Sequence, residues 1–195
     1  MSLVNVNNPA PDPYITLQGF GSEIESRQTL DDLLSATCFA WHRIDREVTG
    51  RLLFPNPHST KSSTSVRIDY VLHPSSWLVQ SGWKWGPIGI EAKASGEKIG
   101  PVIAQCQDYT RSLFTFGNGY QILLPQVFIW PAGTFGGTPQ SIMAQYRIGT
   151  LFPEWKGSKG LVFSFAQQCG LRINEQQEIR ILASAWECGR KQGSR

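Results

Sequence analysis

Several common signatures of function are missing from this sequence of 195 residues. It has no G-x-x-x-x-G-K-[ST] phosphate loop, no G-x-S-x-G nucleophile elbow and no C-x-x-C pair, and its three histidines lie far apart. These absences argue against a P-loop nucleotidase, a serine hydrolase and a structural zinc site. No run of 18 apolar residues and no signal-peptide core occurs, so we expect neither a membrane span nor secretion. The scattered cysteines are expected to be reduced thiols in a cytoplasmic protein; they are Cys38, Cys106, Cys169 and Cys188.

Charge is also scarce. Only 17% of the residues are charged, and the net charge of +3 lacks the strong basic excess of many nucleic-acid-binding proteins. This small excess is concentrated, because residues 40–115 alone carry a net charge equal to that of the whole chain. The hydrophobic content of 41% is typical of a globular protein. We expect an N-terminal arm at residues 1–13, a single domain at 14–188 and a basic, disordered tail at 189–195.

Residues 66–93 contain two apolar segments that also carry charge. Residues 66–72 and 87–93 have the composition of β-strands, and side chains alternate between the faces of a strand. Glu91 and Lys93 should therefore share one face, opposite Ile88 and Ile90. Asp69 lies in the middle of the first apolar segment, where a lone carboxylate is costly to bury. A Mg²⁺ ion held by Asp69 and Glu91 would offset that cost.

The next segment predicts a helix over residues 101–115. It opens with Gly100 and Pro101, and proline is favoured in the first turn of a helix. Gln105 and Tyr109 are four residues apart, so an amide and a phenol lie side by side on this helix.

The order of these residues, Asp69, then Glu91-x-Lys93, then Gln105-x-x-x-Tyr109, resembles the PD-(D/E)XK nuclease superfamily. The glutamine and tyrosine are similar to the fourth motif of its RecB-like and phage-exonuclease-like branches. Ile68 stands where the superfamily's name has proline, and the separation of 22 positions from Asp69 to Glu91 requires a long hairpin or an insertion.

The predicted succession is a helix at 22–48, strands at 51–54, 66–72 and 87–93, a helix at 101–115 and a strand at 120–130. The resemblance implies the same αβββαβ order. It implies an α/β (α+β) protein with a restriction-endonuclease-like core, in which helices flank a central mixed sheet of four to five strands. Beyond it we expect a short helix at 141–149, a strand at 160–166 and an amphipathic helix at 174–186.

The resemblance further implies a metal-dependent DNA nuclease of DNA processing, recombination, repair or phage and mobile-element defence. Asp69, Glu91 and the backbone carbonyl of Ala92 would hold Mg²⁺ or Mn²⁺, and Lys93 would act on the attacking water. Glu23 is a further candidate near the metal, with a solvent-facing glutamate as the alternative. The residues expected to contact DNA, or to hold the site in place, are Gln105, Tyr109, Arg67 and Lys98.

Other interpretations stay open. In a purely structural one, Asp69 is a strand-end carboxylate, Glu91 and Lys93 form a same-face ion pair of little energetic value, and Tyr109 is a core aromatic residue. In another, a nuclease-fold module binds DNA or protein without cutting. The tryptophan-rich segment from Trp77 to Trp85 is expected to form an extra hairpin. Its aromatic rings can pack on the sheet, line a nucleic-acid groove, or bind a protein partner in an adaptor or inhibitor.

Overall fold

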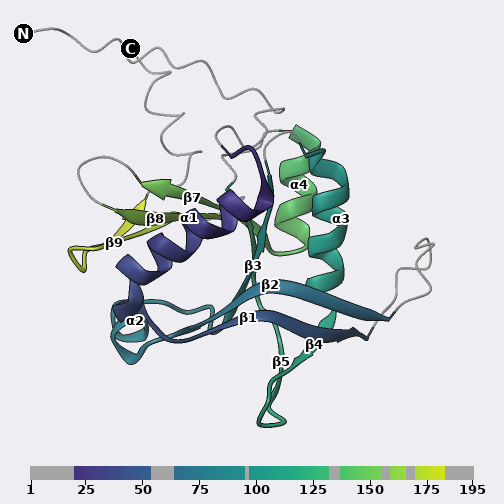
Figure 1. The fold of residues 1–195 in the computed structure, drawn as a ribbon, viewed down its shortest axis with the longest axis horizontal. Helices are drawn as coiled ribbons and strands as arrows, with labels where there is room; N and C mark the ends of the chain where they lie inside the picture. Colours follow the sequence, from purple (N-terminus) through teal and green to yellow (C-terminus); the bar gives the residue numbers. More distant parts are fainter. Residues whose placement is uncertain are drawn as a thin grey trace, which may run out of the picture.

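The computed structural model describes residues 20–53, 64–94, 97–131, 137–154, 159–165 and 170–182. The expected arm at 1–13 and tail at 189–195 lie outside these residues. The described elements form a mixed α+β fold around one large sheet (Figure 1). Its helices are α1 (Glu23–Ala36), a 3₁₀ turn (Cys38–Ala40), α2 (Ser76–Gln80), α3 (Ile99–Thr110) and α4 (Gly137–Gln145). Its strands are β1 (Trp41–Leu52), β2 (Ser65–Pro74), β3 (Ile88–Ala92), β4 (Ser112–Thr115), β5 (Gln121–Leu123), β6 (Val127–Trp130), β7 (Ile148–Glu154), β8 (Gly160–Phe165), β9 (Gly170–Asn174) and β10 (Ile179–Leu182).

The sheet has ten strands in the order β10-β9-β8-β7-β6-β3-β2-β1-β4-β5. Its centre is mixed, because β3 pairs antiparallel with β2 and parallel with β6. The expected order survives as α1, β1, β2, β3, α3 and β6. The expected size of four to five strands is wrong. The hairpin β4–β5 extends the sheet beyond β1, and β7 to β10 extend it beyond β6.

Helix α1 begins where the sequence predicts and ends twelve residues early. The Ser22 side chain accepts a hydrogen bond from the Glu25 amide at 3.2 Å, which caps the first turn. The expected continuation to residue 48 is wrong, because Trp41 starts β1 and pairs with β2. Gly50, two residues past the expected end of the helix, lies inside β1. A Cβ there would come within 2.8 Å of the Phe114 ring, so only glycine fits.

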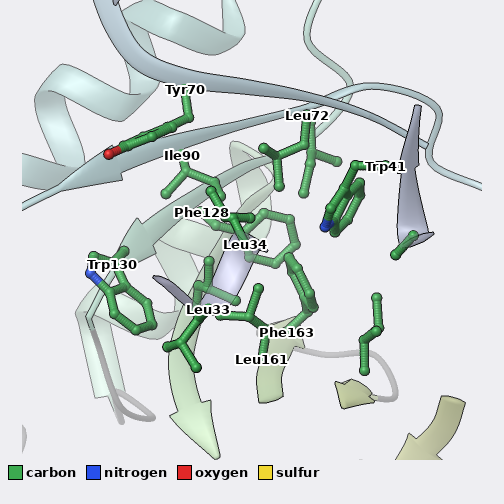
Figure 2. Packing of buried hydrophobic residues seen from close by; sticks show 14 of the residues in the cluster. Leu33, Leu34, Trp41, Tyr70, Leu72, Ile90, Phe128, Trp130, Leu161 and Phe163 are labelled. Atoms are coloured by element: carbon green, nitrogen blue, oxygen red, sulfur yellow. The ribbon is translucent and has the colours of Figure 1, made fainter. Parts of the chain in front are cut away.

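One core cluster fills the face of the sheet covered by α1. Leu33 and Leu34 of α1 pack against Ile90 of β3 and Phe128 of β6 (Figure 2). Phe163 of β8 meets the Phe128 ring edge to face, with ring centroids 5.1 Å apart. Ile88 and Ala92 belong to the same cluster, so the apolar side of β3 faces α1 as the alternation predicts.

The expected hairpin from Trp77 to Trp85 is wrong. Ser75 caps the short helix α2 here, by accepting a hydrogen bond from the Leu78 amide at 3.2 Å. Trp83 is only 3% exposed, and its indole N–H donates to the Gly86 carbonyl at 2.8 Å. The tryptophan rings therefore pack on the α1 face of the sheet, one of the fates the sequence left open.

A second core cluster lies on the opposite face, under α3 and α4, which lie side by side (Figure 1). Val102 and Cys106 of α3 pack there with Val71 of β2 and Ile129 of β6. Helix α3 ends at Thr110, and the expected helical residues 112–115 form β4 instead. Likewise, Ile179–Leu182, expected in a helix, form the strand β10 paired with β9.

Within the described residues, no helix combines the length and apolarity needed to cross a membrane. Cys38 is exposed and Cys106 is buried, both as free thiols, whereas Cys169 and Cys188 lie outside the described residues.

Candidate active site

Asp69 on β2 and Glu91 on β3 face each other across adjacent strands. The antiparallel register pairs Tyr70 with Ile90, so the next step along the two strands sets Asp69 opposite Glu91. Opposed residues project from the same face, with Cβ atoms about 5 Å apart. Both side chains are buried, with exposed fractions of 7% for Asp69 and 3% for Glu91. Two carboxylates far apart in sequence thus lie side by side in the sheet.

The Asp69 carboxylate lies at the point where β3 stops pairing with β2. Its Oδ2 accepts a hydrogen bond from the Ala92 amide at 2.8 Å. The following amide, of Lys93, donates to the Trp130 carbonyl of β6 at 2.8 Å, so β3 stays attached to β6. Burial raises the pKa of Asp69, and the Ala92 hydrogen bond opposes that shift. The side chain therefore stands in for the missing backbone partner on β2.

Glu91 and Lys93 form a buried ion pair with a distance of 2.7 Å between Oε1 and Nζ. Burial, and then the charge of Asp69, raise the pKa of Glu91 to about 7, although Lys93 opposes the shift. Burial lowers the pKa of Lys93, but the hydrogen bond and charge of Glu91 outweigh it, so the pKa is raised. Lys93 is thus held as a cation beside a carboxyl group that burial makes hard to ionise.

Arg27 of α1 is the main component of the site that the sequence did not predict. Its Nη2 lies 2.5 Å from Oε1 of Glu23 and 2.5 Å from Oδ1 of Asp69. Burial lowers the pKa of Arg27, but the charges of Asp69 and Glu23 outweigh it and raise the pKa. Helix α1 thereby links Glu23 to Asp69 through a shared arginine, and the Glu23 side chain is still 39% exposed.

Glu47 of β1 adds a fourth carboxylate on the next strand. It lies opposite Asp69 in the register between β1 and β2, and its φ of +50° is unusual for a non-glycine residue in a strand. One of its oxygens is 3.5 Å from Nη1 of Arg27, and the other is 3.8 Å from Nη1 of Arg67. We call the following residues the acid cluster: Glu23, Arg27, Glu47, Arg67, Asp69, Glu91 and Lys93.

Gln105 and Tyr109 of α3 border the acid cluster. The Gln105 amide donates to the Tyr109 hydroxyl at 2.6 Å, and that hydroxyl donates to the Arg67 carbonyl of β2 at 2.8 Å. Tyr109 is 2% exposed, and burial raises its pKa. These contacts fasten α3 to β2. Lys98 is exposed at the N-cap of α3, and no contact among the described residues joins it to the cluster.

One oxygen of the acid cluster is left without a hydrogen bond. The Tyr109 hydroxyl lies close enough to Glu91 to lower the pKa of its carboxyl group, but its single proton is directed at the Arg67 carbonyl. Among the described residues, Oε2 of Glu91 accordingly accepts no hydrogen bond although it is buried. A buried carboxylate oxygen without a partner costs free energy, and binding an additional positive ligand at this atom would offset that cost.

The donor set suits a hard divalent cation in part. Carboxylate and carbonyl oxygens are the ligands that Mg²⁺ takes, and it usually binds through one or two carboxylates with water completing the shell. Asp69 and Glu91 supply two such groups. No group of three or more His, Cys, Asp or Glu side chains placed to hold a metal occurs in the described part of the chain. The fit therefore rests on this pair and on the unpaired oxygen of Glu91.

Comparisons of the chain with protein-family models, with curated proteins and with solved structures find no match.

Sequence reasoning missed Arg27 and Glu47 for different reasons. Glu23 and Arg27 are four apart in α1, a spacing that signals an ion pair on one face of a helix. That spacing could have identified Arg27 as a partner of Glu23, but not of Asp69, because the docking of α1 is tertiary. Glu47 fell within the wrongly extended helix, so its place opposite Asp69 had no sequence signal.

Proposed function

We propose that the chain is a metal-dependent DNA nuclease that hydrolyses phosphodiester bonds at the acid cluster. The observation that carries the proposal is the cross-strand pair of Asp69 and Glu91 with Lys93 attached to it. Buried carboxylates of this kind, next to a buried amine and with one oxygen unpaired, are expensive to maintain. Residues with strongly perturbed pKa values cluster at functional sites more often than elsewhere.

Asp69 and Glu91, with the backbone carbonyl of Ala92, would hold the Mg²⁺ or Mn²⁺ ion. When bound there, the ion lowers the pKa of a coordinated water and neutralises charge that develops on the phosphate. In the reaction, water adds to phosphorus, one bridging P–O bond breaks, and the departing oxygen takes up a proton. Lys93, kept protonated by Glu91, would orient the attacking water and offset the charge of the phosphate.

The α3 residues would act mainly by positioning. Tyr109 holds α3 to β2 through the Arg67 carbonyl, and Gln105 fixes the orientation of the Tyr109 hydroxyl. Arg67 and Lys98 are exposed, so their side chains would be within reach of the DNA backbone, Arg67 while it stays near Glu47. Such phosphate contacts supply affinity without sequence readout.

The test compares DNA degradation by the purified protein and two lysine variants. Linear and circular DNA, and single strands, are incubated with Mg²⁺ or Mn²⁺ and then with EDTA. We expect metal-dependent cleavage that Lys93→Ala abolishes and that Lys84→Ala, an exposed lysine outside the cluster, leaves unchanged. Inertness of the wild-type protein on every substrate contradicts the proposal.

A catalytically inactive nuclease-fold module is the second candidate. It is favoured by the contact between Arg27 and Asp69, because a guanidinium already neutralises the carboxylate that a metal would need. Such a module would bind DNA or a protein partner, as an adaptor or inhibitor, without cutting. A mobility-shift assay in Mg²⁺ separates the two functions, since a protein that binds DNA without cleaving it supports the DNA-binding module. If the protein neither binds nor cleaves DNA, a protein partner is the remaining target of the module.

A further inference from the structure

One nitrogen atom of Arg27 lies between two carboxylates of the acid cluster. Nη2 is 2.5 Å from Oε1 of Glu23 and 2.5 Å from Oδ1 of Asp69. Mg²⁺ binds carboxylate oxygens at about 2.0 to 2.1 Å. A divalent ion bridging the same two oxygens would therefore occupy nearly the position of this nitrogen, so the guanidinium and the ion cannot be there together.

The charges around this position are unbalanced. Within the acid cluster, four carboxylates face three basic groups. Lys93 pairs with Glu91 and Arg67 lies near Glu47, which leaves the single charge of Arg27 shared between Glu23 and Asp69. If Arg27 withdraws, two negative charges remain uncompensated, and one divalent ion matches that deficit.

The guanidinium group of Arg27 also has an alternative partner in Glu47. Its Nη1 is already 3.5 Å from Oε1 of Glu47, whose side chain is 54% exposed. Its Nε is buried without a hydrogen-bond partner among the described residues, so the present position does not satisfy all its donors. A shift toward Glu47 would keep one ion pair and would move the guanidinium toward solvent.

We propose that Arg27 is a built-in cation that occupies the divalent-ion position at Glu23 and Asp69, and that the ion must displace it to bind. This inference rests on the proposed function, since it presupposes the ion held at Asp69, and it assigns Glu23 as a further ligand of that ion beside Glu91 and the Ala92 carbonyl. It makes the protein self-inhibited at low metal concentration. Part of the binding free energy of the ion is used to expel the guanidinium, so removing Arg27 should tighten metal binding.

The test measures Mn²⁺ binding by calorimetry in the absence of DNA. Arg27→Met keeps most of the side-chain volume and removes the charge. We expect its dissociation constant to fall by about tenfold or more, because a competing positive charge is lost within ion-pair distance. Arg46→Met is the matched control, since Arg46 also joins β1 to an α1 carboxylate, at 2.8 Å from Asp31, but does not contact Asp69. Its dissociation constant should stay within about twofold of wild type.

A measurement on the wild-type protein covers the case in which Arg27→Met fails to fold. The Nε–H signal of Arg27 in a ¹⁵N NMR spectrum should move during a Mg²⁺ titration, whereas that of Arg46 should not. An Arg27 signal that stays fixed while Mg²⁺ saturates the protein overturns the inference. So does equal or weaker Mn²⁺ binding by a folded Arg27→Met variant.

The variant Asp69→Asn separates this failure from failure of the proposed function. If wild type and Arg27→Met bind Mn²⁺ equally and Asp69→Asn loses binding, the metal site stands and only the role of Arg27 is wrong. If no variant binds Mn²⁺, the proposed metal-dependent function fails together with the inference.

Discussion

Two charged clusters lie close together on β1 and β2 and differ in how well they are satisfied. In the first, which we call the histidine cluster, Asp45 accepts hydrogen bonds from Arg43 at 2.7 and 2.9 Å and contacts Nε2 of His73 at 2.9 Å. Both its oxygens have partners, and one acid faces two basic side chains. Only two residues further along β1, Glu47 belongs to the acid cluster, where carboxylates outnumber basic groups and a buried oxygen is unpaired.

The difference suggests distinct uses for the two clusters. A buried polar group with all its partners stabilises or specifies a fold, whereas one without partners costs free energy and needs another reason to be kept. By this criterion the histidine cluster is structural, and the acid cluster fits the ligand site that we propose. Substitutions in the two clusters should then affect stability and activity in opposite ways.

The largest effect is expected from Glu91→Gln. The amide cannot supply the charge that the proposed cation needs, so DNA cleavage should fall by roughly 10³-fold or more. The free energy of unfolding at neutral pH should not fall, because burial raises the pKa of Glu91 to about 7 and ionising this group therefore costs the folded state free energy that the amide avoids. Timed digests and urea denaturation measure the two quantities.

Glu25→Gln is the matched control for this prediction, since its carboxylate is exposed and accepts a hydrogen bond from the Gly21 amide at 3.0 Å. It should leave cleavage unchanged. A Glu91→Gln variant that cuts DNA at the wild-type rate would remove the acid cluster from the chemistry.

The opposite result, a loss of stability without a loss of cleavage, is expected from Asp45→Ala. It leaves Arg43 and the buried His73 without their shared partner, so the free energy of unfolding should fall by about 1 to 3 kcal/mol. Cleavage by the folded fraction should stay at the wild-type level. Urea denaturation gives the first quantity and a digest at low temperature gives the second. Loss of cleavage without loss of stability would mean that the histidine cluster belongs to the site.

The sequence could predict the centre of the acid cluster because it depends on local rules. Alternation puts Glu91 and Lys93 on one face, and an aspartate in an apolar strand signals a buried partner. The pairing of Asp69 with Glu91 needs only that the two strands be adjacent, which their order suggests. The start of α1 was also predictable, from its cap and acidic first turn.

The rest depends on tertiary contacts that no local pattern contains. Arg27 and Asp69 are 42 residues apart in sequence, and they meet only because α1 docks across the sheet. The position of Trp41 in the sequence is compatible with the apolar face of a helix and with a strand. This residue is in a strand because the backbone there pairs with β2. Of the additional strands, β8 was predicted, at 160–166, and it spans Gly160–Phe165. In contrast, β5 has only three residues, too few for a propensity signal, and gains its stability from neighbouring strands.

A smaller effect is expected at the edge of the acid cluster, from Tyr109→Phe. The variant loses the hydrogen bond to the Arg67 carbonyl and the contact with Gln105. The free energy of unfolding should fall by about 1 kcal/mol. Cleavage should weaken less than in Glu91→Gln, because the hydroxyl positions α3 rather than binding the ion. Tyr120→Phe, at an exposed tyrosine, is the control and should change neither quantity. Equal losses of stability in the two variants would show that the buried hydrogen bond contributes nothing.

The smallest effect concerns the pH dependence of the histidine cluster. Burial lowers the pKa of His73, although the hydrogen bond and charge of Asp45 oppose that shift, while Arg43 and His42 add to it. An unfolded histidine has a pKa near about 6.5. The unfolded chain therefore binds a proton more readily than folded His73, so the contribution of this residue is fully present above that pH. It is lost as the pH falls through 6.5 toward the lower folded pKa.

In His73→Gln, the amide can still bond Asp45 but does not titrate, so the fall in unfolding free energy on acidification from pH 7 should be shallower than in wild type. His42→Gln removes one of the smaller causes of the shift, so its slope should lie between those of wild type and His73→Gln. Urea denaturation at a series of pH values measures the slopes, and identical slopes in wild type and His73→Gln would show that this histidine does not resist protonation in the folded state.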